Sequence, residues 1–228
     1  MTNPTPSPLS ASRLDPAEAL HATQVVLFAL ATLAELRESD TESHILRVQH
    51  YVRVLVKQLQ ALPAHADTLT PVYVEMLVTS VPLYDMGTVG IPDRILLKPG
   101  RLTADEMTIM RTHTTLGHDA LARAEKTLGK VSPLLTIAKE ITLSHQEKWD
   151  GSGYPKGLWG AQIPLSARIV ALADVYDALI SNKVYKDGVP HARAVEIITE
   201  GRTTHFDPDV VDAFLAVHTE FAAIAQRF

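Results

Sequence analysis

Six histidine and aspartate side chains, spread over most of the chain, could together bind metal ions. Asp40 and His44 are four residues apart, so one helix would direct both side chains to the same side. Asp174 interrupts the apolar run Ile169–Val175, where a carboxylate is costly unless it is paired or binds a cation. Helical bundles build metal centres from such inward-facing side chains on several helices. The candidate ligands are Asp40, His44, Asp85, His113, His145 and Asp174.

Each of these residues also has an ordinary structural explanation. A single histidine on a helix is more often a core or surface residue than a ligand. A single aspartate in an apolar run is often only hydrogen-bonded. The metal hypothesis therefore depends on the whole set of six. Because the chain has no cysteine, its available ligands are imidazole and carboxylate, which suit hard or borderline ions.

The composition is that of an ordinary globular protein. The chain has 228 residues, of which 46% are hydrophobic and 21% charged. Its net charge of −5 argues against a nucleic-acid polymer as partner, and the lack of cysteine excludes a disulfide scaffold and thiol catalysis. The longest apolar run, Val25–Ala34, is far shorter than the roughly 20 residues of a membrane span, and residues 1–12 do not resemble a secretion signal. We therefore expect a cytoplasmic protein without a membrane partner.

The apolar residues recur at helical spacing along most of the chain, and no alternating strand pattern of useful length is found. We predict an all-α fold, a single compact helical bundle with about seven to nine helices. Residues 1–15 are rich in proline and are expected to form a disordered tail. Two stretches rich in glycine and proline, 87–100 and 151–164, are expected to be loops. The predicted helices begin at Pro16 and then cover about 40–59, 70–83, 103–128, 132–147, 165–180, 191–200 and 207–225.

Several long motifs resemble those of one family. They are Leu83–Asp93, Ile95–Gly100, His145–Pro155 and Ala173–Leu179, and they occur in the family's order. The chain resembles the HD-GYP family, a branch of the HD superfamily of metal-dependent phosphohydrolases, from about residue 20 to the C-terminus. The resemblance implies an HD-type helical domain over 39–228. Residues 16–38 resemble the helix that follows the receiver domain of bacterial response regulators.

The resemblance also implies an activity. Family members hydrolyse cyclic di-GMP to the linear dinucleotide or to GMP at a centre of two or three metal ions, usually iron or manganese. A metal-bridging hydroxide would attack the phosphorus, because a metal-bound water loses its proton far more easily than free water. Cyclic di-GMP is thus the implied substrate.

The same resemblance assigns the ligands residue by residue. His44 corresponds to the first histidine ligand, and Asp40 stands where the family often has a glutamate for a third metal. Asp85 corresponds to the aspartate of the HD pair, which bridges the metals and is therefore the catalytic candidate. The next histidine, the first member of a His-His pair and the last carboxylate correspond to His113, His145 and Asp174.

Other matching positions would contact the substrate. Gly153, Tyr154 and Pro155 form an intact GYP motif, in which Tyr154 would contact the nucleotide. Lys183 and Lys186 fall where basic residues near the substrate phosphates are expected.

Three positions depart from the family pattern. Tyr84 replaces the histidine of the HD pair, Gln146 replaces the second histidine of the His-His pair, and Thr88 replaces a lysine that helps to hold phosphate. A phenol must ionise from a pKa of about 10 before it binds metal well, and a glutamine carbonyl is a poor ligand for transition metals. We expect a degenerate member with weak or absent metal binding and little hydrolysis. The alternative is that Tyr84 and Gln146 are tolerated ligands and that activity persists.

Other functions compete with hydrolysis of cyclic di-GMP. The intact loop Trp149–Gly160 favours a module that senses the dinucleotide or docks a protein such as a GGDEF-type cyclase. A hydrolase of another phosphorylated nucleotide is a third hypothesis, against which the GYP motif argues. A separate receiver protein is a further candidate partner. The apolar face of residues 19–34 could pair with a second copy, which would give a homodimer, or pack on its own domain.

Overall fold

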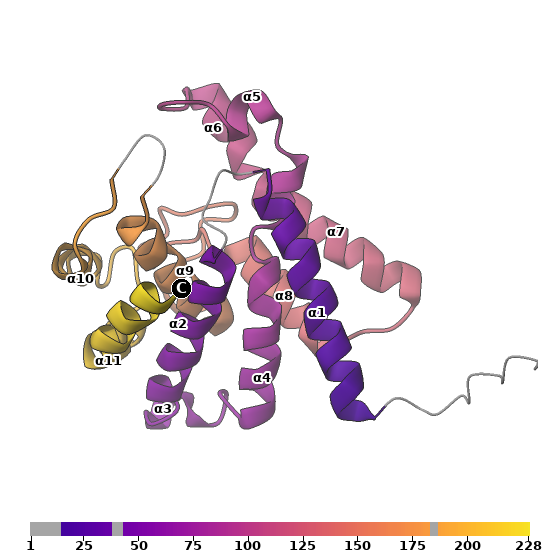
Figure 1. Cartoon of the computed structure of the whole chain (residues 1–228), viewed down its shortest axis with the longest axis horizontal. Coiled ribbons are helices and arrows are strands. Elements are labelled where there is room, and N and C mark those ends of the chain that lie inside the picture. The colour runs from indigo at the N-terminus through magenta and orange to yellow at the C-terminus, as the bar shows by residue number, and fades with distance from the viewer. Residues whose placement is uncertain (1–14, 38–42, 183–186) are drawn as a thin grey trace, which may run out of the picture.

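The computed structural model describes residues 15–37, 43–182 and 187–228, and within them the fold is all-α (Figure 1). No β-structure beyond an isolated bridge between Arg202 and Phe206 occurs in these ranges. Asp40, Lys183 and Lys186, and the expected tail at 1–15 except for its last residue, lie outside the described residues. The α-helices are α1 (Pro16–Glu35), α2 (His44–Leu59), α3 (Pro63–Ala66), α4 (Pro71–Ser80), α5 (Asp93–Leu96), α6 (Ala104–Arg111), α7 (His113–Leu128), α8 (Pro133–Ser144), α9 (Leu165–Ile180), α10 (His191–Glu200) and α11 (Pro208–Arg227), and the 3-10 helices are η1 (Val81–Leu83), η2 (Met86–Gly90) and η3 (Gly160–Gln162).

The helix predicted over 103–128 is in fact two helices, α6 and α7, which meet at Thr112. Side chains bind three consecutive backbone carbonyls at this point. The Thr112 hydroxyl donates to Ile109 O, the His113 ring to Met110 O and the Thr114 hydroxyl to Arg111 O. Side-chain hydrogen bonds of this kind compete with the helical ladder. Figure 1 shows α5 and α6 together at one end of the molecule, beyond the start of α7.

Helices α4, α9 and α11 pack against α2, whose apolar residues recur every three or four positions and are almost all buried. Aromatic rings join it to α9 and α11. Tyr51 of α2 stacks on Phe221 of α11 with 4.5 Å between ring centroids, and Tyr176 of α9 meets Phe221 edge-on at 5.0 Å. The remaining buried ring of this cluster is Phe214. The cluster holds the C-terminal helices against the N-terminal half of the domain.

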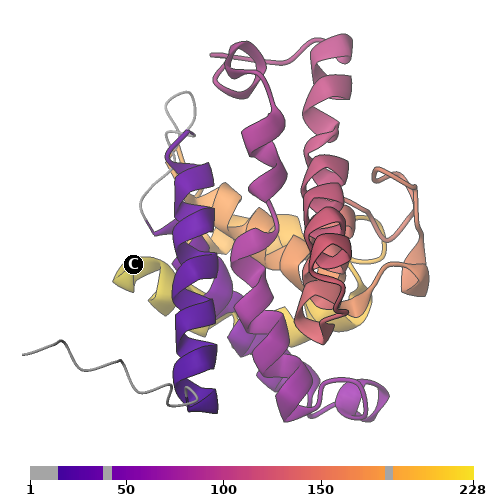
Figure 2. The ribbon, with the colours of Figure 1, turned by 90° about the vertical axis from the view of Figure 1, so that its right-hand side faces the viewer.

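Helix α1 lies along one side of the bundle, against η1, η2 and α4 (Figure 2). Its outer face is apolar and exposed, as in Val26 (57% exposed) and Leu33 (62%). By length and composition, residues Ala17–Glu35 form the one helix in the described ranges that could cross a membrane, although Ala31 and Ala34 are buried against the domain. The homodimer stays a prediction.

The C-terminal end of α1 is hydrogen-bonded to the segment that follows Asp85 and to the start of α2. Arg37 donates to the backbone carbonyls of Thr88, Val89 and Ile91, and it pairs with Asp93. The Glu35 carboxylate accepts the backbone N–H of Ile45 at the start of α2, at 3.2 Å. Helix α1 is thus an integral part of the domain at this end.

Two glycines allow η2 to lie directly against α7. A Cβ atom on Gly87 would stand 1.9 Å from the carbonyl oxygen of His113 and 2.7 Å from the amide nitrogen of Gly117. A Cβ atom on Gly117 would stand 2.5 Å from Cγ2 of Thr142 on α8. This close backbone approach holds the segment after Asp85 next to the first turn of α7, where His113 begins the helix.

Substituting Gly87→Ala is expected to lower the free energy of unfolding by at least about 2 kcal/mol, because the new methyl group would overlap backbone atoms that cannot rotate away. Chemical denaturation measures the effect. Gly90→Ala is the matched control, since its Cβ would meet only Cδ1 of the flexible Leu116 side chain, at 2.7 Å. Equal losses in the two variants would contradict the close packing of η2 on α7.

Candidate metal centre and nucleotide site

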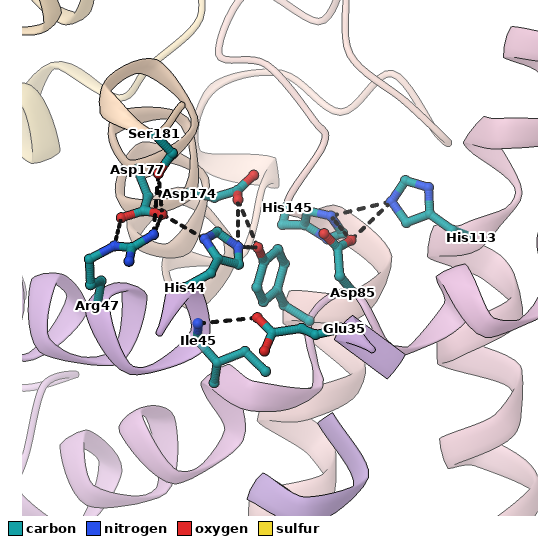
Figure 3. A network of polar contacts seen from close by, with 11 residues as sticks. Glu35, His44, Ile45, Arg47, Asp85, His113, His145, Asp174, Asp177 and Ser181 are labelled. Carbon is teal, nitrogen blue, oxygen red and sulfur yellow. Dashed lines mark hydrogen bonds and ion pairs between the residues drawn. The ribbon is translucent and has the colours of Figure 1, made fainter. Parts of the chain in front are cut away.

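Five segments of the chain meet at one place and bring the candidate ligands together, four of them at helix ends and one, α9, through its interior (Figure 3). His44 begins α2, Asp85 lies between η1 and η2, His113 begins α7, and His145 caps the C-terminus of α8. Pro82 lacks a backbone N–H, and the chain changes from α4 to the 3-10 helix η1 here, which leads directly to Asp85. The last carboxylate comes from α9, at Asp174. All of the predicted ligands in the described residues therefore converge.

Asp85, His113 and His145 form a compact triad. The Oδ1 atom of Asp85 is 3.1 Å from Nε2 of His145 and 3.4 Å from Nε2 of His113, and the two Nε2 atoms are 3.4 Å apart. Both histidines are buried, and Oδ1 of Asp85 is buried without a hydrogen-bond partner of good geometry. Three ligand atoms thus face one another at short range.

Backbone carbonyls set the tautomers of both histidines. Nδ1 of His113 is 2.8 Å from the carbonyl oxygen of Met110, and Nδ1 of His145 is 3.0 Å from that of Ile141. A carbonyl only accepts, so each Nδ1 carries a proton and the Nε2 atom of each neutral ring presents a lone pair to the centre of the triad. Two imidazoles and one carboxylate in this arrangement suit a divalent transition metal such as iron or manganese.

The charges around the triad also favour a bound cation. Burial alone would raise the pKa of Asp85, but the positive charges of protonated His145 and His113, whose Nε2 atoms lie 3.1 and 3.4 Å from Oδ1, lower it to about 2. In turn, Asp85 raises the pKa of His145 even though burial opposes this. The site therefore stabilises a positive charge between these side chains, which a bound cation would provide.

The other half of the site is organised differently, around the hydroxyl of Tyr84. This buried phenol donates to Oδ1 of Asp174 at 2.7 Å and lies 2.6 Å from Nε2 of His44. Burial, and then the charges of Asp174 and Asp85, raise the pKa of Tyr84 well above its usual value, so the hydroxyl keeps its proton. Burial and the charge of Asp85 also raise the pKa of Asp174.

A second carboxylate, that of Asp177, binds the Nδ1 side of the His44 ring. Nδ1 of His44 is 2.7 Å from Oδ2 of Asp177, and Arg47 binds both oxygens of Asp177, each at 2.7 Å. These charge-assisted hydrogen bonds outweigh burial and lower the pKa of Asp177 to about 2. Because an ionised carboxylate only accepts, Nδ1 of His44 carries a proton. The Tyr84 hydroxyl gives its one proton to Asp174, so the contact at Nε2 is a hydrogen bond only when this nitrogen also carries a proton and donates to the phenol oxygen.

The GYP motif forms one wall beside the triad. The Tyr154 ring meets His113 edge-on with 6.2 Å between centroids, and the Arg111 guanidinium lies 4.9 Å from the centre of the same ring. Burial, and then the charge of Asp85, raise the pKa of Tyr154 to about 12. A Cβ atom on Gly153 would stand 2.3 Å from the backbone nitrogen of Lys148, so glycine is needed for this close approach. The next residue, Pro155, is exposed.

Glu147 orders the loop that carries this motif. Its carboxylate is 2% exposed and accepts the backbone N–H groups of Lys156, at 2.8 Å, and Leu158, at 3.0 Å. Trp149 lies beside Arg168 with 5.8 Å from the guanidinium to the ring centre, so it attaches the loop to α9. Trp159, by contrast, is 63% exposed.

The departures from the family pattern occupy distinct positions. Thr88 is buried and lines a cavity of about 170 Å³ together with Tyr84, Asp85 and Asp174. Gln146 follows His145 and accepts the Tyr154 N–H through its backbone oxygen, and no hydrogen bond joins its amide to the triad in the described part of the chain.

Sequence reasoning missed several residues that the site uses. Asp177 and Arg47 support His44, Glu147 orders the loop that carries the GYP motif, and Arg111 covers Tyr154. The signal for Asp177 was present, because it stands one helical turn after Asp174 and therefore shares its face. For the others, only the three-dimensional packing shows the partner.

The fold and site are those of the HD-domain family, and the chain belongs to it. The family's pattern matches residues 29–210. A cyclic di-GMP phosphodiesterase of Vibrio cholerae is 55% identical over 204 residues, which are 90% of this chain and 41% of that protein. One of Thermotoga maritima with the same name is 40% identical over 202 residues, 89% of this chain and 51% of that protein. These relatives confirm the resemblance to the HD-GYP branch.

A solved structure shares the fold. A cyclic GMP-AMP specific phosphodiesterase of Vibrio cholerae superposes with a TM-score of 0.61 at 19% identity, over 90% of this chain and 52% of that one. The chain spans about half the length of these relatives or less.

Proposed function

We propose that this chain is an HD-GYP protein of cyclic di-GMP signalling in which phosphodiesterase activity is weak or lost. The observation that carries this proposal is the hydroxyl of Tyr84, hydrogen-bonded between His44 and Asp174 where the family has a histidine ligand. Cyclic di-GMP is favoured as the nucleotide because the 55% and 40% identical relatives are named for it.

The charges around the cavity support low activity. Its walls include the carboxylates of Glu35, Asp85 and Asp174, and no lysine or arginine lines it among the residues that the structure describes. Thr88 provides no positive charge where the family has a lysine. A phosphodiester approaching this surface would meet negative charge, so it needs a metal ion for binding as well as for chemistry.

Part of the catalytic machinery is nevertheless present. Asp85, His113 and His145 would hold a metal ion, which supplies Lewis acidity and lowers the pKa of a bound water. Tyr154 and Arg111 would position the nucleotide beside this triad. The implied third-metal position and the two phosphate-binding lysines, at Asp40, Lys183 and Lys186, lie outside the described residues.

A second candidate function is a non-catalytic sensor of cyclic di-GMP or a docking module for a GGDEF-type protein. The ordered nucleotide loop favours it, because the buried Glu147 carboxylate fixes the backbone of this loop independently of the triad. Binding without turnover would then be the function.

The test combines turnover and binding. The protein is purified with iron or manganese, incubated with cyclic di-GMP, and titrated with the same nucleotide by calorimetry with and without metal. We expect little linear dinucleotide or GMP, and metal-dependent binding. Turnover at ordinary enzyme rates would overturn the proposal. Binding that is equal without metal would favour the sensor, and no binding in either condition would favour a docking module.

A further inference from the structure

We infer that this chain binds one metal ion, at Asp85, His113 and His145, and that the Tyr84 hydroxyl takes the place of a second ion. The inference deepens the proposed function, on which it rests only for the identity of the substrate. The sequence alone indicates that both metal positions lose one imidazole. The structure separates them into a half that stays fit for a metal and a half closed by hydrogen bonds.

The triad has the spacing of ligands around one ion. Atoms bound at 2.0–2.2 Å to an octahedral or tetrahedral metal are about 3.0–3.4 Å from one another. The three separations among Asp85 Oδ1 and the two Nε2 atoms are 3.1, 3.4 and 3.4 Å. When both rings are neutral and no ion is bound, lone pairs of His113 and His145 face each other and a carboxylate oxygen with no donor between them. A single cation satisfies all three.

Protons take the place of the metal in the other half. The Tyr84 hydroxyl donates to Asp174, and the phenol oxygen lies at hydrogen-bond distance from Nε2 of His44. With a proton on Nε2, His44 donates to the phenol oxygen while the phenol donates to Asp174, so this chain of hydrogen bonds places two protons where an ion would lie. An ion between His44 and Asp174 would have to displace both of these hydrogen bonds of the phenol.

The convergence of ligand atoms supports the same division. Among the described residues, the triad is the group of three or more histidine and acidic side chains whose ligand atoms all lie within 4.8 Å of one another. His44 and Asp174 are not part of it, and their ligand atoms are 3.8 Å apart on either side of the phenol. The spacing of His44 and Asp174 would also admit an ion bound by an ionised Tyr84, so the experiment must detect that ligand directly.

The experiment counts ions and identifies their ligands. The protein is loaded with excess Mn²⁺ or, without oxygen, Fe²⁺, desalted, and its metal measured per chain by mass spectrometry. We expect about one ion per chain, and an electron paramagnetic resonance signal of isolated Mn²⁺ rather than of a coupled pair. After oxidation of the iron form, the visible spectrum should lack a tyrosinate-to-iron charge-transfer band.

Matched variants locate the ion. His113→Gln should lose at least about nine-tenths of the metal, because it removes a triad ligand. Tyr84→Phe should keep the wild-type metal content, because the phenol is not a ligand. His118→Ala is the control for a histidine on the same helix, which bonds Asp119 on the surface. Circular dichroism confirms that each variant is folded.

Each contrary result overturns the inference. Two ions per chain, a coupled Mn²⁺ pair, a tyrosinate band, or metal loss in Tyr84→Phe would show that the second position is a working metal site. Full metal content in His113→Gln would show that the triad does not hold the ion. Ordinary turnover with one ion would overturn the proposed function but leave this inference intact, and two ions without turnover would do the reverse.

Discussion

The triple variant Tyr84→His/Gln146→His/Thr88→Lys is expected to hydrolyse cyclic di-GMP at least about a hundredfold faster than the parent chain. It restores an imidazole to each metal position and a cation beside the phosphate, and both features stabilise the charge that develops on phosphorus and its leaving oxygen. The metal content should rise from about one to about two ions per chain. Product chromatography and metal analysis measure the two effects.

The single variant Gln146→His is the matched control for this result. It adds an imidazole next to His145 but leaves Tyr84 bonded between His44 and Asp174. We expect the metal content to remain near one ion per chain and the rate to gain much less than in the triple variant. If metal content stays unchanged in the triple variant as well, the missing imidazoles are not what limits metal binding.

Substituting Asp177→Asn is expected to cost about 3–5 kcal/mol of unfolding free energy, the largest stability effect among the polar side chains of the site. It removes the carboxylate whose two oxygens the buried Arg47 binds, and it weakens the hydrogen bond to His44. Asp119→Asn, on the surface beside His118, is the control and should change stability by less than about 1 kcal/mol. Urea denaturation at neutral pH gives both values.

The same carboxylate should make stability depend on pH in the acid range. The pKa of Asp177 is about 2 in the folded chain and 3.8 as its reference value, so folding favours its ionised form by about 2 kcal/mol. That contribution is fully present above about pH 4 and is lost as the pH falls through about 2. The difference in stability between wild type and Asp177→Asn should therefore shrink over this range. A constant difference would contradict the ion pair.

The helical fold could be predicted because the apolar spacing of α2, α9 and α11 is regular and each helix buries the expected face. The break between α6 and α7 could not, since it depends on which carbonyls the hydroxyls of Thr112 and Thr114 and the ring of His113 bind. Periodicity carries no information on that choice.

The ligand set was predictable from motifs, but the inequality of the two metal positions was not. The sequence shows that Tyr84 and Gln146 replace histidines. It does not show that the Tyr84 hydroxyl reaches both His44 and Asp174, while the triad of Asp85 and two histidines keeps its spacing without help from Gln146. The short distance between Asp85 and His113 depends on the close approach of η2 to α7, which requires glycine at positions 87 and 117.

The way α1 ends has a mechanical consequence. Arg37 donates hydrogen bonds to backbone carbonyls shortly after Asp85, and Glu35 accepts the backbone N–H of the residue after His44. The end of α1 therefore binds both the segment that follows Asp85 of the triad and the segment that follows His44, which contacts the Tyr84 phenol. A molecule that bound the exposed outer face of α1 and shifted this helix would therefore also shift these two segments, and with them the spacing between the triad and the phenol.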